Sequence, residues 1–133
     1  MKISRTFWRA RREFIGDSAR EICGRLEIPT KHLQIASTRT PGLYGWAYMS
    51  NSIAVGYRLG RLAVYKSLAH ELRHVWQWRN GLLQLRRGVW YWEGRPEITT
   101  SALEFANASG GPRYYYLPWE IDAREFEDAH LLE

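Results

Sequence analysis

Apolar residues recur at helical intervals early in the chain and then switch to alternation. Between residues 18 and 27 they form one side of a predicted helix, which consists of Ala19, Ile22, Cys23 and Leu26. Asp17 or Ser18 can cap this helix, and the Ile28-Pro29 pair ends it. Residues 32–38 then alternate in polarity, which predicts a strand.

A second strand region follows a turn-rich connection at residues 40–45. Residues 46–50 and 53–57 are apolar runs on either side of Asn51-Ser52, and they predict a β-hairpin or two neighbouring strands. An exposed edge strand can hold an extended peptide through main-chain hydrogen bonds. The 46–57 segment is therefore our candidate for a peptide-binding edge, although a place in an ordinary core sheet is its simpler role.

A longer helix is expected after the connection at residues 58–61, and it runs to about Asn80. Leu68, Leu72 and Val75 form its apolar row, at intervals of four and three residues. Gly81 follows as a C-terminal stop. This helix carries most of the chemistry considered below.

The last third of the chain is harder to interpret. Glycine and proline interrupt residues 81–112, where the pattern predicts a short helix from Glu97 or Thr99 to Ala108. A final helix begins near Pro118, and its expected packing side is Ile121, Ala123, Phe126 and Ala129. Because the chain shows no repeat and no low-complexity linker, we expect one α+β domain spanning residues 1–133.

The 61–80 helix contains His70-Glu71-Leu72-Arg73-His74, an H-E-x-x-H motif. Two histidines four residues apart lie on one face of a helix, so both can present a ring nitrogen to the same ion. Glu71 would then stand beside the open coordination position and take a proton from a bound water. The alternative is a pair of surface histidines beside an ordinary glutamate. With four histidines in the chain, such a motif arises by accident in roughly one chain in a hundred.

A catalytic zinc ion normally takes three protein ligands and leaves one position open, so the motif needs a third ligand from elsewhere. Glu120, in the first turn of the C-terminal helix, is the preferred residue, and Asp122 and His130 are alternatives. A carboxylate there also interacts favourably with the helix dipole, which is compatible with ligation. The predicted metal site is Zn²⁺ held by His70, His74 and Glu120.

These residues predict a zinc metallopeptidase that hydrolyses peptide bonds. Glu71 would act as the general base and pass the proton to the leaving amine. The developing oxyanion also needs a donor, and we assign Tyr115 from the tyrosines at 114–116, with Arg124 as an alternative. Packing in the core is the simpler role for a tyrosine cluster.

Composition places the chain among folded proteins, with 45% hydrophobic and 14% aromatic residues in 133. Cys23 is the single cysteine, which excludes an internal disulfide and is typical of a reducing compartment. No apolar run approaches membrane-spanning length, and residues 1–12 lack the apolar core of a signal peptide. We therefore expect a cytoplasmic protein with no membrane partner.

The net charge is +5 and the sequence pI is about 9.6, which favours acidic partners. Residues 1–12 form a basic arm whose charged members are Lys2, Arg5, Arg9, Arg11 and Arg12. Phe7 and Trp8 lie among these residues, and the mixture is compatible with binding phosphate groups of nucleic acid. A solvated helix face is the simpler interpretation.

An alternative function is a basic nucleic-acid- or protein-binding module that retains a structural zinc site. Arg86 and Arg87 would extend its surface beyond the basic arm. In a closed structural site a fourth ligand, such as His32, His130 or Asp122, would replace water. The glutamate of the motif would then have no chemical task, which argues mildly against this alternative.

The segment 69–77, followed 46 residues after His74 by Glu120-Ile-Asp-Ala-Arg124, resembles the minimal gluzincin metallopeptidases. These include ImmA/IrrE-like proteins and membrane-bound CAAX-processing relatives. Their third ligand is a glutamate on a following helix, in patterns such as E-x-x-A-D or E-x-E-A-N, and Glu120 matches it. The resemblance implies a zincin-like fold with an N-terminal helix, a small antiparallel or mixed sheet, the motif helix and a ligand helix. It also implies a regulatory or DNA-associated protein as substrate.

One departure from the family pattern bears on the site. Arg124 stands where those families usually have Asp or Asn, a residue that supports a ligand histidine. Because arginine does not accept that hydrogen bond, the support must come from elsewhere, and Asp122 and Asp128 are candidates. A histidine as third ligand would instead resemble the SprT-like proteases, although their histidine follows the motif more closely than His130 does.

Overall fold

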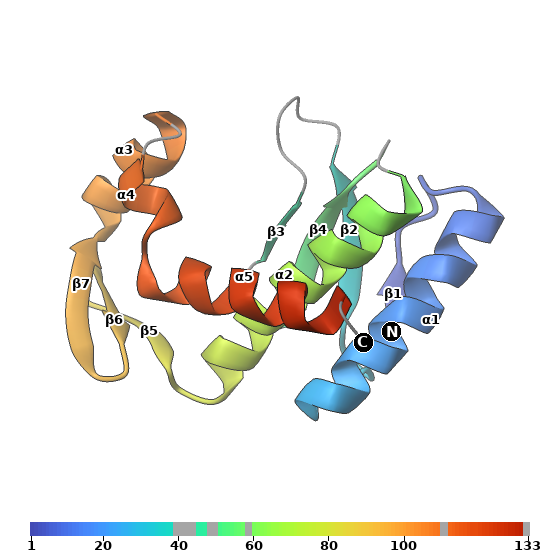
Figure 1. Cartoon of the computed structure of the whole chain (residues 1–133), viewed down its shortest axis with the longest axis horizontal. Helices are drawn as coiled ribbons and strands as arrows, with labels where there is room; N and C mark the ends of the chain where they lie inside the picture. Colours follow the sequence, from blue (N-terminus) through green and yellow to red (C-terminus); the bar gives the residue numbers. More distant parts are fainter. Residues whose placement is uncertain (39–44, 48–50, 58–59, 110–111, 132–133) are drawn as a thin grey trace.

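A computed structural model describes the chain except for residues 39–44, 48–50, 58–59, 110–111 and 132–133. The described residues form five helices and two small sheets, which confirms the expected α+β class. The predicted turn at residues 40–45 lies almost wholly outside the described residues. Two helices, α2 (Arg61–Arg79) and α5 (Pro118–Leu131), run through the middle of the molecule with a sheet toward either end (Figure 1).

The first sheet is mixed and has the order β1-β2-β4-β3. Its strands are β1 (Lys2–Ile3), β2 (Gln34–Thr38), β3 (Gly45–Ala47) and β4 (Ser52–Gly56). β1, β2 and β4 are parallel to one another. β3 pairs with β4 in the antiparallel direction, with Trp46 opposite Ala54. The prediction of a strand at 32–38 and of two neighbouring strands at 46–57 is thus confirmed, and β3 lies at the sheet edge.

The main core lies between this sheet and helices α1 (Arg9–Leu26) and α2. Helix α1 ends where expected but begins well before Asp17, so the predicted cap at Asp17 or Ser18 is wrong. The apolar side continues towards the N-terminus through the buried residue Ile15, while Ser18 is itself buried in the middle of the helix. Residues 9–12 of the basic arm therefore belong to the first turns of α1.

The second sheet is an antiparallel meander of β5 (Leu83–Arg86), β6 (Val89–Trp92) and β7 (Arg95–Thr99). Two-residue turns connect its strands, Arg87-Gly88 and Glu93-Gly94, and all four residues have φ between 49° and 81°. Such values define type I′ hairpin turns, for which glycine at the second position is favoured. This sheet was not predicted, although the two X-Gly pairs were its signal in the sequence.

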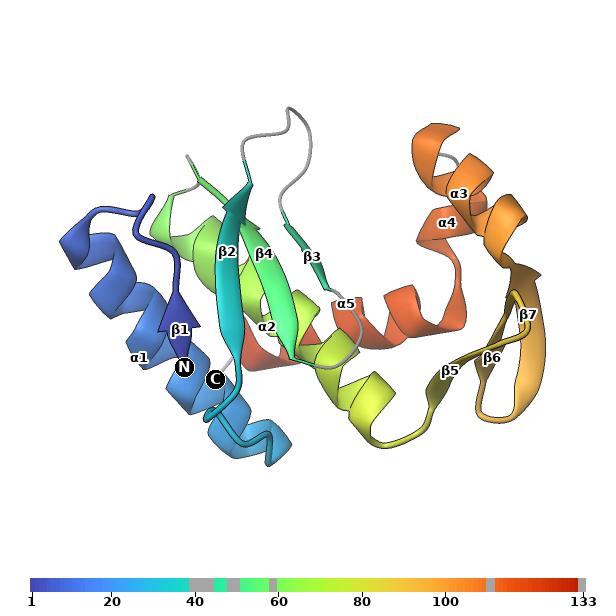
Figure 2. The ribbon, with the colours of Figure 1, turned by 180° about the vertical axis from the view of Figure 1, so that it is seen from behind.

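Helices α3 (Thr100–Ser109) and α4 (Pro112–Tyr115) follow the second sheet. The short helix predicted from Glu97 or Thr99 to Ala108 is confirmed as α3. A smaller core joins this part to the rest of the molecule, and its buried members are Leu83, Ile98, Leu117 and Trp119. Figure 2 shows the same arrangement from behind, with α3, α4 and the second sheet at the opposite end from α1.

Helix α5 starts at Pro118 as predicted and packs along α2. Its expected packing side was wrong in part, because Ile121 is 37% exposed and Ala129 is also exposed. Trp119 and Ala123, one turn apart, are buried instead. None of the described helices combines the length and apolar character that a membrane crossing requires.

Replacing Leu68 by Ala should lower the free energy of unfolding by about 3 kcal/mol, since its fully buried side chain would leave a cavity between α2 and the sheet. Leu62→Ala on the same helix, at a position 69% exposed, should change it by less than about 0.5 kcal/mol. Urea denaturation in the presence of a chelator measures both. Equal effects of the two substitutions would contradict this packing of α2.

Candidate metal centre

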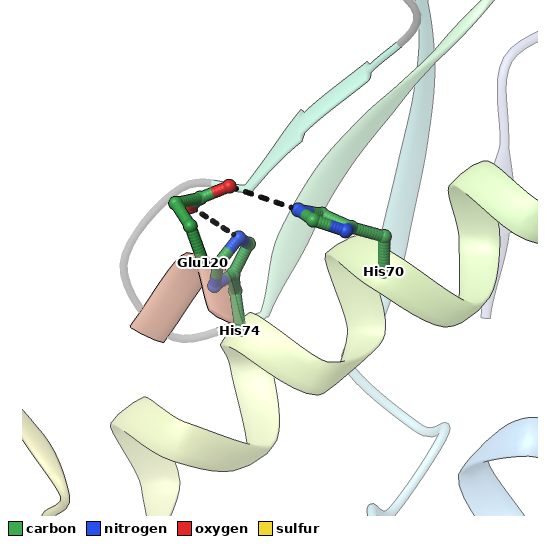
Figure 3. Close-up of side chains that lie close together, drawn as sticks. All are labelled: His70, His74 and Glu120. Carbon is green, nitrogen blue, oxygen red and sulfur yellow. Dashed lines mark hydrogen bonds and ion pairs between the residues drawn. The ribbon is translucent and has the colours of Figure 1, made fainter. Parts of the chain in front are cut away.

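Three side chains from α2 and α5 meet at the centre of the molecule (Figure 3). The Nε2 atom of His70 lies 3.0 Å from Oε1 of Glu120, and Nε2 of His74 lies 2.9 Å from its Oε2. One donor atom from each residue can be chosen so that all three lie within 4.8 Å of one another. The structure therefore brings together the three residues that the sequence predicted as metal ligands.

Helix geometry explains this convergence. His70 and His74 are one turn apart on α2, and Figure 3 shows both rings directed to the same side of the helix. Glu120 stands in the first turn of α5, where Pro118 suits the first helical position. Since α5 packs along α2, this first turn lies over the two histidines.

The other nitrogen of each histidine ring has its own acceptor. Nδ1 of His70 lies 3.0 Å from Oε1 of Glu127, and Nδ1 of His74 lies 2.9 Å from Oε1 of Gln77. The amide nitrogen of Gln77 donates to the backbone oxygen of Trp119 at 2.9 Å and to Oδ2 of Asp122 at 2.8 Å. Because both of these partners only accept, the orientation of the Gln77 amide is fixed, and its oxygen must face His74.

These contacts determine what the site can bind. A ring nitrogen that faces an acceptor carries its hydrogen, so in the neutral ring Nε2 offers a lone pair. In neutral rings the Nε2 atoms of His70 and His74 would face the Glu120 carboxylate as acceptor against acceptor, so a proton or a metal ion between them would stabilise the group. Two imidazole nitrogens and one carboxylate oxygen within 4.8 Å of one another could hold a zinc ion.

Asp122, an alternative third ligand, and Asp128, a candidate support, form ion pairs with other residues. Asp122 receives two hydrogen bonds from Arg73, from Nε at 2.8 Å and from Nη2 at 3.1 Å, in addition to that from Gln77. The guanidinium of Arg73 also lies 3.7 Å from the ring centre of Trp76. Asp122 therefore stabilises the pairing of α2 with α5 and supports His74 indirectly through Gln77. Asp128 pairs instead with Lys66, at 3.9 Å.

His130 is buried at the other end of α5, away from the three predicted ligands. Its ring stacks on Tyr65, with 5.4 Å between ring centres, and also lies beside Phe126. Its Nε2 atom is 4.0 Å from the nearest oxygen of Glu21. Like the exposed residue His32, it does not belong to the group of metal-ligating atoms found among the described residues.

The histidines and Glu120 shift one another's pKa values towards the charged forms. Burial by itself would lower the pKa of His70, but hydrogen bonds to Glu120 and Glu127 outweigh it and raise the pKa to about 10. Burial would raise the pKa of Glu120, yet His74 and His70 hold that pKa below its usual range. The arrangement thus favours positive charge beside Glu120, whether protons or a metal ion supply it.

Glu71 and Tyr114 complete the electrostatic environment. Burial raises the pKa of Glu71 to about 7, although the two histidines partly oppose this change. A carboxyl group with such a pKa is able both to accept and to return a proton near neutral pH. Burial also raises the pKa of Tyr114, and the charges of Glu120 and Glu71 raise it further. Its hydroxyl group is therefore electrostatically coupled to the site.

The predicted oxyanion donor, Tyr115, is 52% exposed, and the guanidinium of Arg124 lies 3.5 Å from its ring centre. Tyr116, its neighbour, is 65% exposed. Tyr114 is the least exposed of the three tyrosines. The role of Tyr115 remains a prediction.

Sequence reasoning missed Glu127 and Gln77 as partners of the ligand histidines. Gln77 is three residues after His74, and Glu127 is seven after Glu120, so each lies on the same helix face as a ligand. Those spacings were the available signal. Glu127 for His70 and Gln77 for His74 thus provide the acceptors that Arg124 cannot provide.

The chain matches no protein-family model, no curated protein and no solved structure. A proposal for the function therefore rests on the chemistry of the site residues themselves.

Replacing Glu127 by Ala should weaken zinc binding by about 10- to 100-fold, because Nδ1 of His70 loses the acceptor that fixes its tautomer. Competition with a chromophoric chelator measures this affinity. Glu125→Ala, at an exposed position of the same helix, is the control and should leave the affinity unchanged. Equal affinities of the Glu127 variant and the parent would show that Glu127 does not orient His70.

Replacing Gln77 by Met should lower the free energy of unfolding by about 2–4 kcal/mol in the presence of a chelator. The substitution keeps the length of this fully buried side chain but removes its hydrogen bonds to His74, Trp119 and Asp122. Urea unfolding followed by circular dichroism measures the change. A loss below about 0.5 kcal/mol would mean that these bonds contribute little to holding α5 on α2.

Proposed function

We propose that this protein is a zinc-dependent peptidase of the zincin-like, gluzincin type. His70, His74 and Glu120 would hold the metal, and Glu71 would be the general base. The observation that carries the proposal is the orientation of the two rings: both Nδ1 atoms face Glu127 or Gln77, and both Nε2 atoms face the Glu120 carboxylate, where neutral rings would offer their lone pairs to a metal ion. This donor set, two imidazoles and one carboxylate, is one that zinc prefers in catalytic sites.

Three ligands favour a catalytic site over a structural one. The described residues contribute three donor side chains to the group and no fourth, whereas structural zinc sites are normally closed by four protein ligands. The complete H-E-x-x-H motif supports the same choice. Glu71 is buried beside the histidines, and a structural site would leave this costly buried carboxyl group without a task.

The residues around the metal divide the steps of hydrolysis. When bound, zinc lowers the pKa of a water towards neutrality and polarises the substrate carbonyl. Glu71 accepts the proton of the attacking water and returns it to the nitrogen of the leaving amine. Its pKa near 7 suits both transfers. Glu127 and Gln77 keep the ligand rings in the orientation that the reaction requires.

A tyrosine is the proposed donor to the developing oxyanion. Tyr114 is favoured because it immediately precedes the other two tyrosines on the approach to α5, is partly buried, and has its pKa raised by burial and by the charges of Glu120 and Glu71. A high pKa also keeps the group protonated, as a donor must be. Tyr115, our choice from sequence, would have to leave its contact with Arg124 to take the same role.

Edge strand β3 is the proposed guide for an extended peptide. It is the last strand of its sheet and packs against α2, the helix that carries both histidines. Figure 3 shows β3 behind the three side chains. A peptide pairing with this edge would use main-chain hydrogen bonds, so recognition would depend little on its side chains.

We place the enzyme in the cytoplasm, because its single cysteine is a buried free thiol.

Metal content provides one test. The purified parent should carry about one zinc per chain by plasma mass spectrometry, while His74→Ala and Glu120→Ala should lose most of it. His130→Gln is the matched control and should keep the metal, because His130 lies among Tyr65 and Phe126. Full occupancy of the Glu120 variant would exclude Glu120 as a ligand.

The Glu71→Gln substitution tests the chemical step. It should reduce peptide hydrolysis by about 10²- to 10⁴-fold, because an amide cannot accept the proton, while zinc content stays near that of the parent. Cleavage of a denatured protein such as casein, followed by mass spectrometry, gives the rate. Hydrolysis by the Glu71→Gln protein at the parental rate would overturn the proposal, and so would zinc-loaded parent that cleaves neither casein nor a diverse peptide library.

A further inference from the structure

The basic arm is rich in positive charge, and the proposed peptidase mechanism assigns it no role. Five of the 19 Lys and Arg residues and none of the 14 Asp and Glu residues lie in residues 1–12. The rest of the chain therefore has 14 of each sign and no net charge. The whole net charge of +5 belongs to the first twelve residues.

The structure places this segment where two helices begin. β1 pairs with β2 in the first sheet, and Arg12 donates from Nη1 to the backbone oxygen of Phe7 at 2.6 Å. The part of the arm before α1 is thereby held against the first turns of that helix. Figures 1 and 2 both show the start of α1 and the start of α2 at the same end of the molecule.

Arginine and aromatic side chains alternate at this end. Trp8, Arg11 and Phe14 are spaced by three residues and so share one side of α1. The guanidinium carbon of Arg11 lies 5.4 Å from the ring centre of Trp8, and that of Arg61, the first residue of α2, lies 5.3 Å from the ring centre of Phe14. We refer to Trp8, Arg11, Phe14 and Arg61 as the arginine–aromatic face. A stacked guanidinium is already partly ordered, so it loses less freedom when it binds a phosphate.

We infer that the arginine–aromatic face binds the phosphodiester backbone of nucleic acid without base specificity. The guanidinium group matches phosphate geometry, and Trp8, 58% exposed, offers a ring on which an unpaired base can stack. An anionic lipid surface fits less well, because α1 buries its apolar side in the core and cannot insert it among lipid chains.

This surface also lies close to the metal centre. His70 is nine residues after Arg61 on the same helix, which corresponds to about 14 Å along its axis. Nucleic acid on the arginine–aromatic face would bring its bound proteins near the site. This link to substrate choice rests on the proposed peptidase function, but the binding of nucleic acid does not.

Fluorescence anisotropy of the full-length protein with a labelled 20-base-pair DNA duplex and a 20-nucleotide single strand tests the inference. At 50 mM NaCl the parent should bind both in the micromolar range, and affinity should fall steeply with salt. Arg11→Gln/Arg61→Gln should weaken binding at least about tenfold and reduce the slope of log K against log salt by about 2, one unit for each lost phosphate contact. Trp8→Ala should weaken the single strand more than the duplex.

Arg95→Gln/Arg113→Gln is the matched control, since it removes the same charge from exposed positions of β7 and α4, at the opposite end of the molecule from α1. It should change affinity and slope little. Unaltered zinc content and thermal unfolding of both double variants would show that their folds and metal sites remain intact. The inference is overturned if the parent binds neither DNA at 50 mM NaCl, if both double variants weaken binding equally, or if the parent binds anionic vesicles but no DNA. None of these outcomes depends on peptide hydrolysis.

Discussion

The side-chain amide of Gln77 makes the contacts on which the geometry of the His70, His74 and Glu120 group depends. It is fully buried, accepts from the ring of His74 and donates both to Asp122 and to the backbone of Trp119, the residue before Glu120. One amide thus links a histidine of α2 to the backbone that carries the glutamate of α5. A buried amide without partners is costly, so α5 is held in the register that satisfies it.

Buried ionisable groups make the interface of α2 and α5 interdependent. Glu71, His70, His74 and Glu120 are largely shielded from water, and their mutual interactions compensate for the loss of hydration. Removal of one partner leaves an uncompensated charge in a region of low polarity. A metal ion that replaces protons between Glu120 and the histidines would strengthen the same interface, so metal binding and folding of this region should be coupled.

Local sequence rules predicted the elements that depend on local spacing. The motif helix, the start of α5 and the two histidines on one face follow from intervals of three and four residues. The start of α1 was misplaced because Asp17 and Ser18 look like caps, whereas burial of Ile15 extends the helix through the basic residues before them. Tertiary packing outweighed the local preference for a cap.

The supports of the histidines could not be assigned from sequence for a related reason. On α5, positions 124 and 127 both project near the face of Glu120, and the pattern alone does not say which one reaches a histidine. In the structure Arg124 stacks on Tyr115. The side chain of Glu127, which is one methylene longer than that of an aspartate, reaches Nδ1 of His70. The choice depends on the distance between α2 and α5, which side chains such as Gln77 and Arg73 set. In this chain the acceptor for Nδ1 of His70 is therefore Glu127, whose side chain is long enough to span the distance between α5 and α2.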